Sequence, residues 1–318
     1  MHYLVTGGLG YLGGRLIEHL LEKGNSVSVT TRGDTEKYPV LNNKVTVYQV
    51  MTGEVGGWAD SLDGVDFLFH LAAPDAESAG QDPVSAMAAG SEMAWNLLSE
   101  ISRINTRIPV INLSTFHVYG PKARGVISES TPPDPQHPYS ISQFFSETAA
   151  RYFAGRNNLQ IVNVRLSNAF GRPLYYEMAN WSLVFNELCR QGATSSRLCL
   201  NTVGSQKRNF ITMEDAVRAL WFLADHVNDW PEDHVLNLGS TMHRSIREVA
   251  ELVAQRCKAL WGKTVKIVVP EGSTSVQPPE FSFDVSRLEN MGFFWKNQFV
   301  REIDDTLVAC REWSEPNG

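Results

Sequence analysis

A glycine-rich segment near the N-terminus has the residue types and spacing needed to hold a phosphate group. Residues 6–13 read Thr-Gly-Gly-Leu-Gly-Tyr-Leu-Gly, so Gly7, Gly10 and Gly13 recur at every third position. An apolar segment precedes the loop, and leucines at helical spacing follow it. Glycine lets a backbone turn tightly and approach a pyrophosphate, while the first amides of the helix face the anion. The pattern therefore predicts a dinucleotide-binding loop rather than a simple strand-to-helix turn.

The end of the next predicted strand bears on the choice of dinucleotide. An acidic residue there binds the ribose 2′-hydroxyl of NAD, whereas an arginine accommodates the 2′-phosphate of NADP. The sequence has Thr30-Thr31-Arg32-Gly33, with no acid at this place. Arg32 favours NADP, unless it is only a solvated loop residue. Asp34 lies close enough to leave NAD as the alternative.

The elements that must position this loop alternate along the first half of the chain. Strands are predicted over residues 2–6, 27–30, 45–50, 65–71, 109–113 and 161–166, and helices over 15–23, 84–104 and 140–153. This rhythm indicates βαβ units and a parallel sheet. Helices then predominate (181–190, 213–224 and 245–259), and a strand over 234–238 is expected to return to the sheet.

We therefore predict an α/β protein with a Rossmann-type, doubly wound parallel sheet and a smaller C-terminal α/β substrate lobe. The dinucleotide-binding domain is expected to span residues 1–166 and the lobe residues 167–318. The active site of such a protein lies in the cleft between the two parts.

Composition narrows the classes of function. The 318 residues carry a net charge of −7, which argues against a nucleic-acid partner. No apolar stretch is long enough to span a membrane, and the N-terminus lacks the regions of a signal peptide. The four cysteines are far apart, and neither they nor the histidines have metal-ligand spacing. We expect free thiols, no metal and a cytoplasmic location.

Further segments make a resemblance specific. They are residues 114–120 (Ser-Thr-Phe-His-Val-Tyr-Gly), Pro138-Tyr139 before a helix, residues 165–171 (Arg-Leu-Ser-Asn-Ala-Phe-Gly), residues 206–215 and residues 237–240. Together with the glycine loop, these segments resemble the extended short-chain dehydrogenase/reductase family over essentially the whole chain. That family includes nucleotide-sugar 4-epimerases, 4,6-dehydratases and 4-ketoreductases, so the resemblance implies a nucleotide-activated sugar as the substrate.

The resemblance implies a catalytic pair. Thr115 matches the Ser/Thr that hydrogen-bonds the reacting sugar oxygen, and Tyr139 matches the acid/base tyrosine. Such a phenol exchanges a proton with the carbinol oxygen while the nicotinamide exchanges a hydride. For Ser114 we expect only a strand-end hydroxyl that caps the backbone.

One departure from the family concerns the residue that lowers the tyrosine pKa. The family pattern is Tyr-x-x-x-Lys, but here Gln143 follows Tyr139 by four residues. Glutamine can hydrogen-bond the nicotinamide ribose, yet it supplies no positive charge, so the phenolate is scarce at neutral pH. Alcohol oxidation needs a base, whereas ketone reduction needs an acid. The sequence therefore favours reduction of a keto-sugar, with or without epimerisation.

A second departure concerns dehydration. Dehydratases of the family carry an Asp-Glu pair where this chain has Phe116 and His117, so dehydration is set aside. GDP-fucose synthase-like members place an acid/base cysteine at the position of His117, and an imidazole could do the same work. The alternative is a histidine hydrogen-bonded in the cleft wall.

Residues for the cofactor follow from the loop and the resemblance. They are Gly7, Gly10, Leu12, Gly13, Thr31, Arg32, Leu71, Ala72, Tyr139 and Gln143. Met51, Asp75 and Gly90 stand where relatives have polar contacts to the cofactor (an Asp, a Lys and an Asn). Binding is therefore expected to be looser than in epimerases, which hold NAD throughout turnover.

On the substrate side, the resemblance assigns Thr115, Asn168, Asn180 and Arg208. Asn180 is expected at the start of a helix that faces the diphosphate, and Arg208 as the clamp of the nucleotide. The alternative for Arg208 is a surface salt bridge with Glu214 or Asp215. A homodimer is expected through the helices of Trp95 and of Phe144 and Phe145, one of these phenylalanines facing the core.

Three functions remain after these comparisons. The first is an NADP(H)-leaning reductase, or reductase/epimerase, of a nucleotide sugar. The second is a 4-epimerase with tightly bound NAD. The third is a cofactor-binding scaffold or sensor with little catalysis, which the retained Thr115 and Tyr139 argue against.

Overall fold

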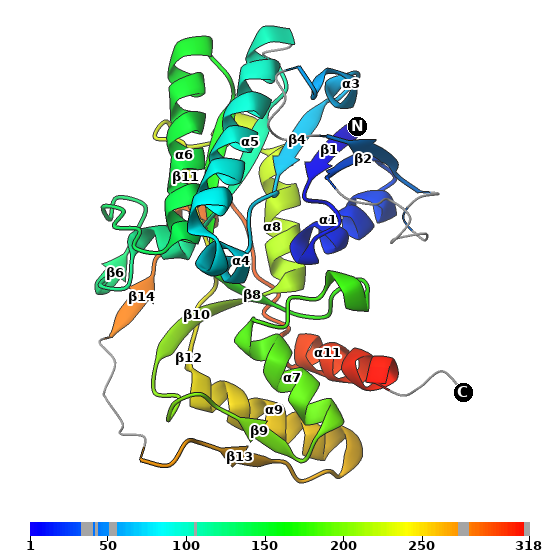
Figure 1. Cartoon of the computed structure of the whole chain (residues 1–318), viewed down its shortest axis with the longest axis vertical. Coiled ribbons are helices and arrows are strands. Elements are labelled where there is room, and N and C mark those ends of the chain that lie inside the picture. The colour runs from blue at the N-terminus through cyan, green and yellow to red at the C-terminus, as the bar shows by residue number, and fades with distance from the viewer. Residues whose placement is uncertain (33–40, 42–43, 51–55, 105–106, 273–279, 315–318) are drawn as a thin grey trace.

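Seven parallel strands form the centre of the molecule (Figure 1). The computed structural model describes residues 1–32, 41, 44–50, 56–104, 107–272 and 280–314. The strand order is β11-β7-β5-β4-β1-β2-β3, and every neighbouring pair runs parallel. The strands are β1 His2–Thr6, β2 Ser26–Thr31, β3 Thr46–Gln49, β4 Phe67–His70, β5 Val110–Thr115, β7 Ile161–Leu166 and β11 Val235–Leu238. The predicted parallel sheet, including the returning strand, is confirmed.

Helices cover both faces of this sheet because successive strand residues point to opposite sides. Tyr3 and Val5 of β1 face a core shared with α1 (Tyr11–Glu22) and α8 (Met213–Asp225). Leu4 faces the other core, which α5 (Pro83–Ile104) and α6 (Pro138–Asn157) share. Figure 1 shows α5 and α6 side by side on one face and α1 and α8 on the other. A sheet buried on both faces explains the nearly continuous apolar strands.

A second lobe follows β7 and has its own core. It contains the sheet β12-β10-β8 and the pair β13-β9, with a third helical layer around them. Its elements are β8 Asn168–Phe170, β9 Arg197–Cys199, β10 Lys207–Thr212, β12 Met242–Ser245, β13 Lys266–Val268, α7 Val184–Thr194, α9 Ile246–Trp261 and α11 Phe299–Ser314. Figure 1 shows this lobe below the large sheet, with β8 and β10 leading into it.

Short elements complete the described chain. They are α3 Ala59–Leu62, α4 Ala76–Gln81, α10 Ser286–Asn290, the 3₁₀ turns η2 Phe116–Tyr119, η3 Tyr176–Met178 and η4 Val227–Asp229, and the pair β6 Gly125–Ile127 and β14 Phe281–Phe283. The four cysteines are free, as predicted. Within the described ranges, no helix combines the length and apolarity needed to cross a membrane.

Two predicted helices begin at other residues. The helix expected over 15–23 is α1, which begins earlier, at Tyr11. The helix expected over 181–190 spans Val184–Thr194, and its N-cap is Leu183. Asn180 instead accepts hydrogen bonds from the backbone N and the hydroxyl of Ser182, at 3.1 and 2.6 Å. This side-chain turn competes with helix formation, so the helix starts one turn later. The expected place of Asn180 at a helix N-terminus is therefore wrong.

Candidate functional site

A cavity of about 230 Å³ opens at the carboxyl ends of β1, β2 and β4. It is lined by Gly7, Leu9, Gly10, Thr30, Thr31, Arg32, Val50, Trp58, Leu71, Ala72, Ala73, Pro74, Ala89 and Met93. Six of the ten residues predicted to bind the cofactor belong to this lining. Ligands of open α/β sheets bind at such strand ends, so the position fits a dinucleotide.

The glycine loop has a shape that side chains would obstruct. Gly7 has φ +68°, and a Cβ there would lie 2.8 Å from the backbone of Ala72. A Cβ on Gly13 would lie 2.3 Å from the Gly7 carbonyl oxygen. Gly10 is the N-cap of α1, and its backbone N donates to the Gly7 carbonyl at 2.9 Å. The loop and the first turn of α1 therefore approach each other more closely than residues with side chains allow. A pyrophosphate-binding loop requires this close approach.

The other predicted residues of this cavity have different surroundings. Thr31 and Arg32 line it, and no carboxylate belongs to its described lining. Leu12 does not line it, because its side chain packs in the core beside α1. Asp34 and Met51 lie outside the described residues. The ribose end of the cavity thus presents an arginine and a threonine.

Part of the cavity wall is apolar. Val50, Trp58 and Met93 line it, and all three are buried. Apolar and aromatic side chains of this kind can pack against the flat face of an aromatic base. These residues therefore fit the adenine of a dinucleotide.

Thr115, Tyr139 and Gln143 meet where β5 and α6 come together. Thr115 ends β5, and its hydroxyl oxygen accepts a hydrogen bond from the His117 backbone N at 3.3 Å. Tyr139 lies in the first turn of α6, next to Pro138 and the N-cap His137. The side chains of both Gln143 and Thr115 are polar neighbours of the Tyr139 hydroxyl, and both act to lower its pKa. The structure thus brings together the three residues that the sequence predicted.

Among the described residues, no cation offsets the burial of this phenol. Burial raises the pKa of Tyr139, and Asp75 adds to the rise, while the polar side chains of Gln143 and Thr115 act in the opposite direction. The net shift is upward, so Tyr139 is a neutral phenol at neutral pH. Asp75, which is the N-cap of α4, follows Pro74 of the first cavity. The catalytic cluster therefore lies next to the predicted cofactor site.

His117 lies beside this cluster, with its ring centroid 6.5 Å from that of Tyr139. Burial of the ring lowers the pKa of His117 to about 4, and the nearby charges of Arg208 and His137 contribute in the same direction. The imidazole is therefore neutral at pH 7 and can accept a proton. Ser114 differs from its prediction, because its hydroxyl donates to Glu147 Oε1 at 2.5 Å instead of capping the backbone.

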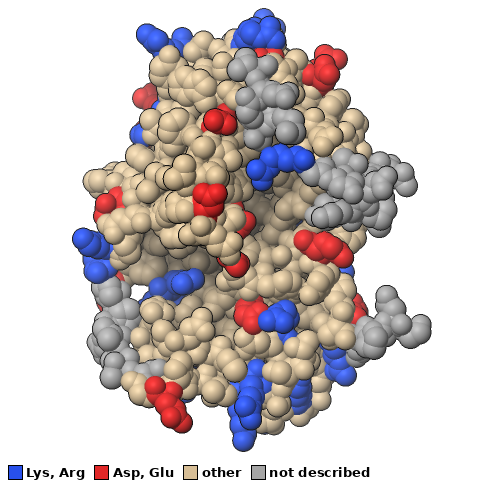
Figure 2. Space-filling view, viewed as in Figure 1, with Lys and Arg blue, Asp and Glu red and all other residues tan. Residues whose placement is uncertain are grey.

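A larger cleft of about 590 Å³ adjoins His117 on the side of the second lobe. Its lining is Phe116, His117, Gly120, Pro121, Ala123, Arg124, Gln136, His137, Ser140, Asn168, Gln206, Lys207, Arg208 and Phe281. Figure 2 shows the molecule hollowed between its two lobes, with basic side chains at the edge of the hollow. The described lining includes three cations and no carboxylate, although the whole chain is acidic. Such a cleft suits an anionic ligand.

The predicted substrate residues divide into two groups. Asn168 and Arg208 line the cleft, and Asn168 Nδ2 also donates to the Asn209 carbonyl at 2.9 Å. Asn180 does not line it and forms the turn described above. The salt bridge considered for Arg208 does not form, because Glu214 pairs with Lys296 and Asp215 with Arg218.

Comparison with known proteins places this geometry in a family. The family model described as the NAD dependent epimerase/dehydratase family matches residues 3–239, which is most of the chain. The chain belongs to this family. The model spans the glycine loop, the Thr115–Tyr139 cluster and the returning strand β11.

Individual relatives of the family are distant. An uncharacterized UDP-glucose epimerase, YtcB, from Bacillus subtilis (strain 168) is 27% identical over 80% of this chain and 81% of its own. A UDP-N-acetyl-alpha-D-glucosaminuronate decarboxylase of Bacillus cytotoxicus is 24% identical over 97% of both chains. The structure of a Thermotoga maritima UDP-glucose 4-epimerase with UDP-glucose has a TM-score of 0.81 at 22% identity, covering 99% of this chain and 100% of that one. This structural similarity shows that the two proteins share a fold.

Two of the departures from the family have a structural reason. A Cβ on Gly90 would lie 2.0 Å from the hydroxyl of Ser142, so the close approach of α5 and α6 leaves no room for an asparagine. Asp75 caps α4 by accepting from the Ser78 backbone N at 2.8 Å. Each position thus has a packing or capping task in place of a cofactor contact.

Several cleft residues were not singled out from the sequence. His137, Arg124, Lys207 and Phe281 all line the larger cleft. His137 immediately precedes Pro138, and proline favours the first turn of a helix, so the order His-Pro could have marked it as an N-cap. No local signal identifies Phe281, because only the pairing of β14 with β6 brings it to the cleft.

Proposed function

We propose that this chain is an NAD(P)-dependent oxidoreductase of a nucleotide-activated sugar, and that its main reaction is the reduction of a keto-sugar. The observation that carries the proposal is the buried Tyr139 hydroxyl, which lies beside the uncharged side chains of Thr115 and Gln143 and has a raised pKa. Domain roles follow from the two cavities. Residues 1–166 would bind the dinucleotide. Residues 167–318 would bind the nucleotide sugar through Asn168, Lys207 and Arg208, in a cleft whose other wall comes from residues 116–140, while β11 and α8 return to the large sheet.

The neutral phenol supports this direction of reaction. A carbonyl oxygen that accepts a hydride at its carbon must also gain a proton, and a phenol of raised pKa holds that proton at neutral pH. Thr115 hydrogen-bonds the same oxygen and orients it toward Tyr139. When bound, a nicotinamide dinucleotide supplies the hydride. The reverse reaction needs the phenolate, which no cation stabilises among the described neighbours of Tyr139.

For the cofactor we propose NADP, with NAD as the alternative. The loop from Gly7 to Gly13 would hold the pyrophosphate, with Leu71 and Ala72 beside it. Thr31 and Arg32 would face the substituted ribose, where an arginine suits a 2′-phosphate. Val50, Trp58 and Met93 would pack against the adenine, and Tyr139 and Gln143 would hold the nicotinamide ribose. Solved relatives with NAD, such as a Bacillus cereus UDP-glucuronic acid 4-epimerase, keep the alternative open.

For the substrate we propose a nucleoside diphosphate linked to a sugar. Arg208, Lys207 and Arg124 would neutralise the phosphates, and Asn168 would contact the sugar or the phosphate next to it. Relatives whose names specify UDP-sugars or dTDP-glucose support this class of ligand. Arg208 lines the cleft and forms no ion pair with another described residue, which supports the same class of ligand independently.

The second candidate is a nucleotide-sugar 4-epimerase that retains NAD. The Thr115–Tyr139 pair and the names of several relatives favour it. A neutral His117 beside Tyr139 also permits epimerisation next to a ketone, since it can accept a proton. A homodimer through α5 and α6 fits either candidate, because Trp95 and Phe145 are exposed there while Phe144 packs inward.

A substrate panel tests the proposal. The purified protein is mixed with NADPH or NADH and with 4-keto-sugars carrying UDP, dTDP, GDP or CDP, and absorbance at the reduced nicotinamide band is followed. We expect turnover with at least one keto-sugar and its loss in Tyr139→Phe. Turnover that persists in Tyr139→Phe contradicts the role of the phenol. No turnover, despite epimerisation of a UDP-hexose, would select the second candidate.

A further inference from the structure

A buried ion pair lies directly behind the catalytic cluster. Arg165 of β7 donates to Glu147 of α6 through two parallel hydrogen bonds, Nε to Oε1 at 2.9 Å and Nη2 to Oε2 at 2.7 Å. The side chains are 2% and 0% exposed. Buried ion pairs seldom add net stability, because desolvation offsets the attraction and apolar residues of similar volume often serve as well. Stability alone therefore does not explain the ion pair between Arg165 and Glu147.

The carboxylate of Glu147 joins the two elements that carry the catalytic residues. Its Oε1 also accepts from the Ser114 hydroxyl at 2.5 Å, and Ser114 directly precedes Thr115 on β5. Glu147 follows Gln143 by four residues and Tyr139 by eight, so all three lie on one face of α6. Glu147 thus ties the residue next to Thr115 at the end of β5 to the face of α6 that presents Tyr139.

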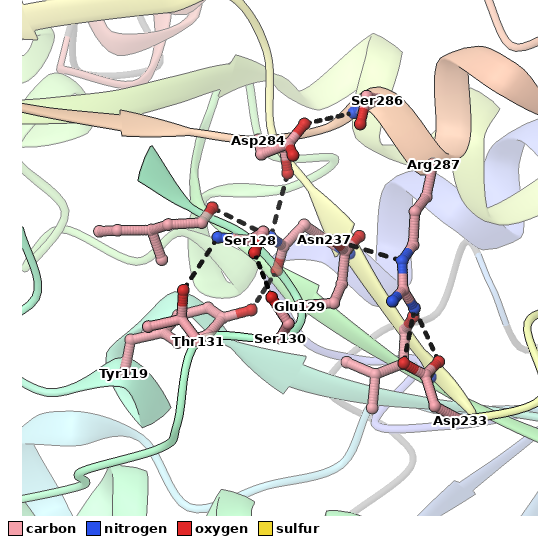
Figure 3. Close-up of polar contacts among 12 residues, drawn as sticks. Tyr119, Ser128, Glu129, Ser130, Thr131, Asp233, Asn237, Asp284, Ser286 and Arg287 are labelled. Atoms are coloured by element: carbon pink, nitrogen blue, oxygen red, sulfur yellow. Dashed lines mark hydrogen bonds and ion pairs between the residues drawn. The ribbon is translucent and has the colours of Figure 1, made fainter. Parts of the chain in front are cut away.

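The network continues to the turn of His117. The Arg165 guanidinium lies over the ring of Tyr119, 4.7 Å from its centroid, and Tyr119 is the last residue of η2. The Tyr119 hydroxyl donates to Asn237 Oδ1 at 2.6 Å, and Asn237 Nδ2 donates to the Asp284 carbonyl at 3.0 Å. Figure 3 shows Asn237 between Tyr119 on one side and Asp284 on the other. The network therefore also anchors the segment that places His117.

We propose that Glu147 is a positioning residue that holds the Tyr139 hydroxyl against Thr115 through its bonds to Ser114 and Arg165. The inference rests on the proposed role of Tyr139 as the proton donor. Because Gln143 brings no charge to the phenol, proton transfer depends on the alignment of Tyr139, Thr115 and the substrate oxygen. Misplacement of such groups by a fraction of an ångström lowers the rate of the chemical step.

A matched pair of serine variants separates positioning from stability. Ser114→Ala removes one hydrogen bond to Glu147 and leaves the ion pair intact. The control is Ser146→Ala. Ser146 is next to Glu147 on α6 and is also buried, and its hydroxyl donates to Asn112 Oδ1 at 2.9 Å, so it joins α6 to β5 three residues before Thr115. We expect similar melting temperatures for the two variants. Only Ser114→Ala should lower kcat, roughly 10-fold or more, with a KM for NADPH that stays within about 2-fold.

A spectroscopic readout keeps this test independent of the proposed reaction. The chain has nine tyrosines, so labelling them with ¹³C at Cζ and comparing with Tyr139→Phe assigns the Tyr139 signal. We expect this signal to move in Ser114→Ala and to stay in Ser146→Ala. If the wild-type protein reduces no keto-sugar, the proposed function fails. The NMR comparison of the two serine variants still shows whether Glu147 positions Tyr139.

The inference is overturned if the Tyr139 signal does not move in Ser114→Ala, or if both serine variants have the same kcat. A second variant addresses the ion pair itself. Glu147→Leu combined with Arg165→Met replaces it with apolar side chains, and we expect a folded protein with the kcat loss of Ser114→Ala or a larger one. A folded double variant with the wild-type kcat also overturns the inference.

Discussion

At the scale of single residues, the direction of reaction that we propose rests on the environment of Tyr139. Burial, with no cation nearby among the described residues, raises its pKa, so the side chain carries a proton at neutral pH. That proton suits reduction and hinders oxidation. Thr115 and Gln143 are polar neighbours of the hydroxyl that bring no charge.

Gln143→Lys tests this argument. A cation one helical turn away should lower the pKa of Tyr139 by roughly 1–3 pH units. The wild-type rate of reduction should stay level until the pH rises through the raised pKa of Tyr139, and in the variant the fall should begin at lower pH. The rate of alcohol oxidation at neutral pH should rise. Gln143→Met is the uncharged control, and identical pH profiles in all three proteins would refute the argument.

His117 gives a second residue-scale prediction. With a pKa lowered to about 4 by its surroundings, it should remain neutral from pH 8 down to about pH 5. NMR titration of the histidine ring protons, assigned by His117→Gln, measures this directly. A midpoint near the ordinary value of about 6.5 would mean that the cleft does not desolvate the ring, and His117 would then be partly protonated near neutrality.

At the scale of elements, the strand–glycine–helix unit carries the cofactor argument. Gly13→Ala places a Cβ 2.3 Å from the Gly7 carbonyl oxygen, so α1 must move away from the loop. Overpacking of this kind costs roughly 1–3 kcal/mol of unfolding free energy, and the affinity for NADPH should fall with it. Gly155→Ala is the control, since a Cβ there meets no atom within 4 Å. It should be neutral or stabilising by roughly 0.5–1 kcal/mol, with unchanged NADPH binding.

Much of the element order could be predicted because buried parallel strands and amphipathic helices have distinct patterns. β1 and its glycine loop, β11 and α6 are where the sequence indicates them, and the local motifs locate Thr115 and Tyr139 at the meeting of β5 and α6. The start of α7 could not be predicted, because the hydrogen bonds of Asn180 to Ser182 compete with a helix whose apolar spacing begins earlier.

The rest of the site depends on contacts that are distant in the sequence. Glu147 meets Arg165 and Ser114 only when α6 packs across β5 and β7. Phe281 reaches the cleft only through the pairing of β14 with β6. No local sequence motif marks either residue as part of the site. Helical spacing places Glu147 on the same face of α6 as Tyr139, but it does not reveal the contacts of Glu147 with Arg165 and Ser114.

At the scale of the whole molecule, we assign the cofactor to the smaller cavity and the substrate to the larger cleft. Arg208→Gln should weaken binding of nucleoside diphosphates roughly 10- to 100-fold, since charge-assisted hydrogen bonds are lost. Binding of NADPH should not change, because Arg208 lines only the larger cleft. Calorimetric titration with UDP, dTDP, GDP and CDP measures the first effect and identifies the base. Equal weakening of NADPH binding would mean that the two cavities hold one ligand.

We propose above all that the protein is a reductase that exchanges its dinucleotide in each turnover. The most direct measurement is to denature the purified protein, identify any released dinucleotide by mass spectrometry, and titrate the protein freed of it with NADPH and NADH. For such a reductase we expect little bound dinucleotide and tighter binding of NADPH than of NADH. Near-stoichiometric NAD that survives purification would contradict it and would favour an epimerase that oxidises and reduces its substrate in one site.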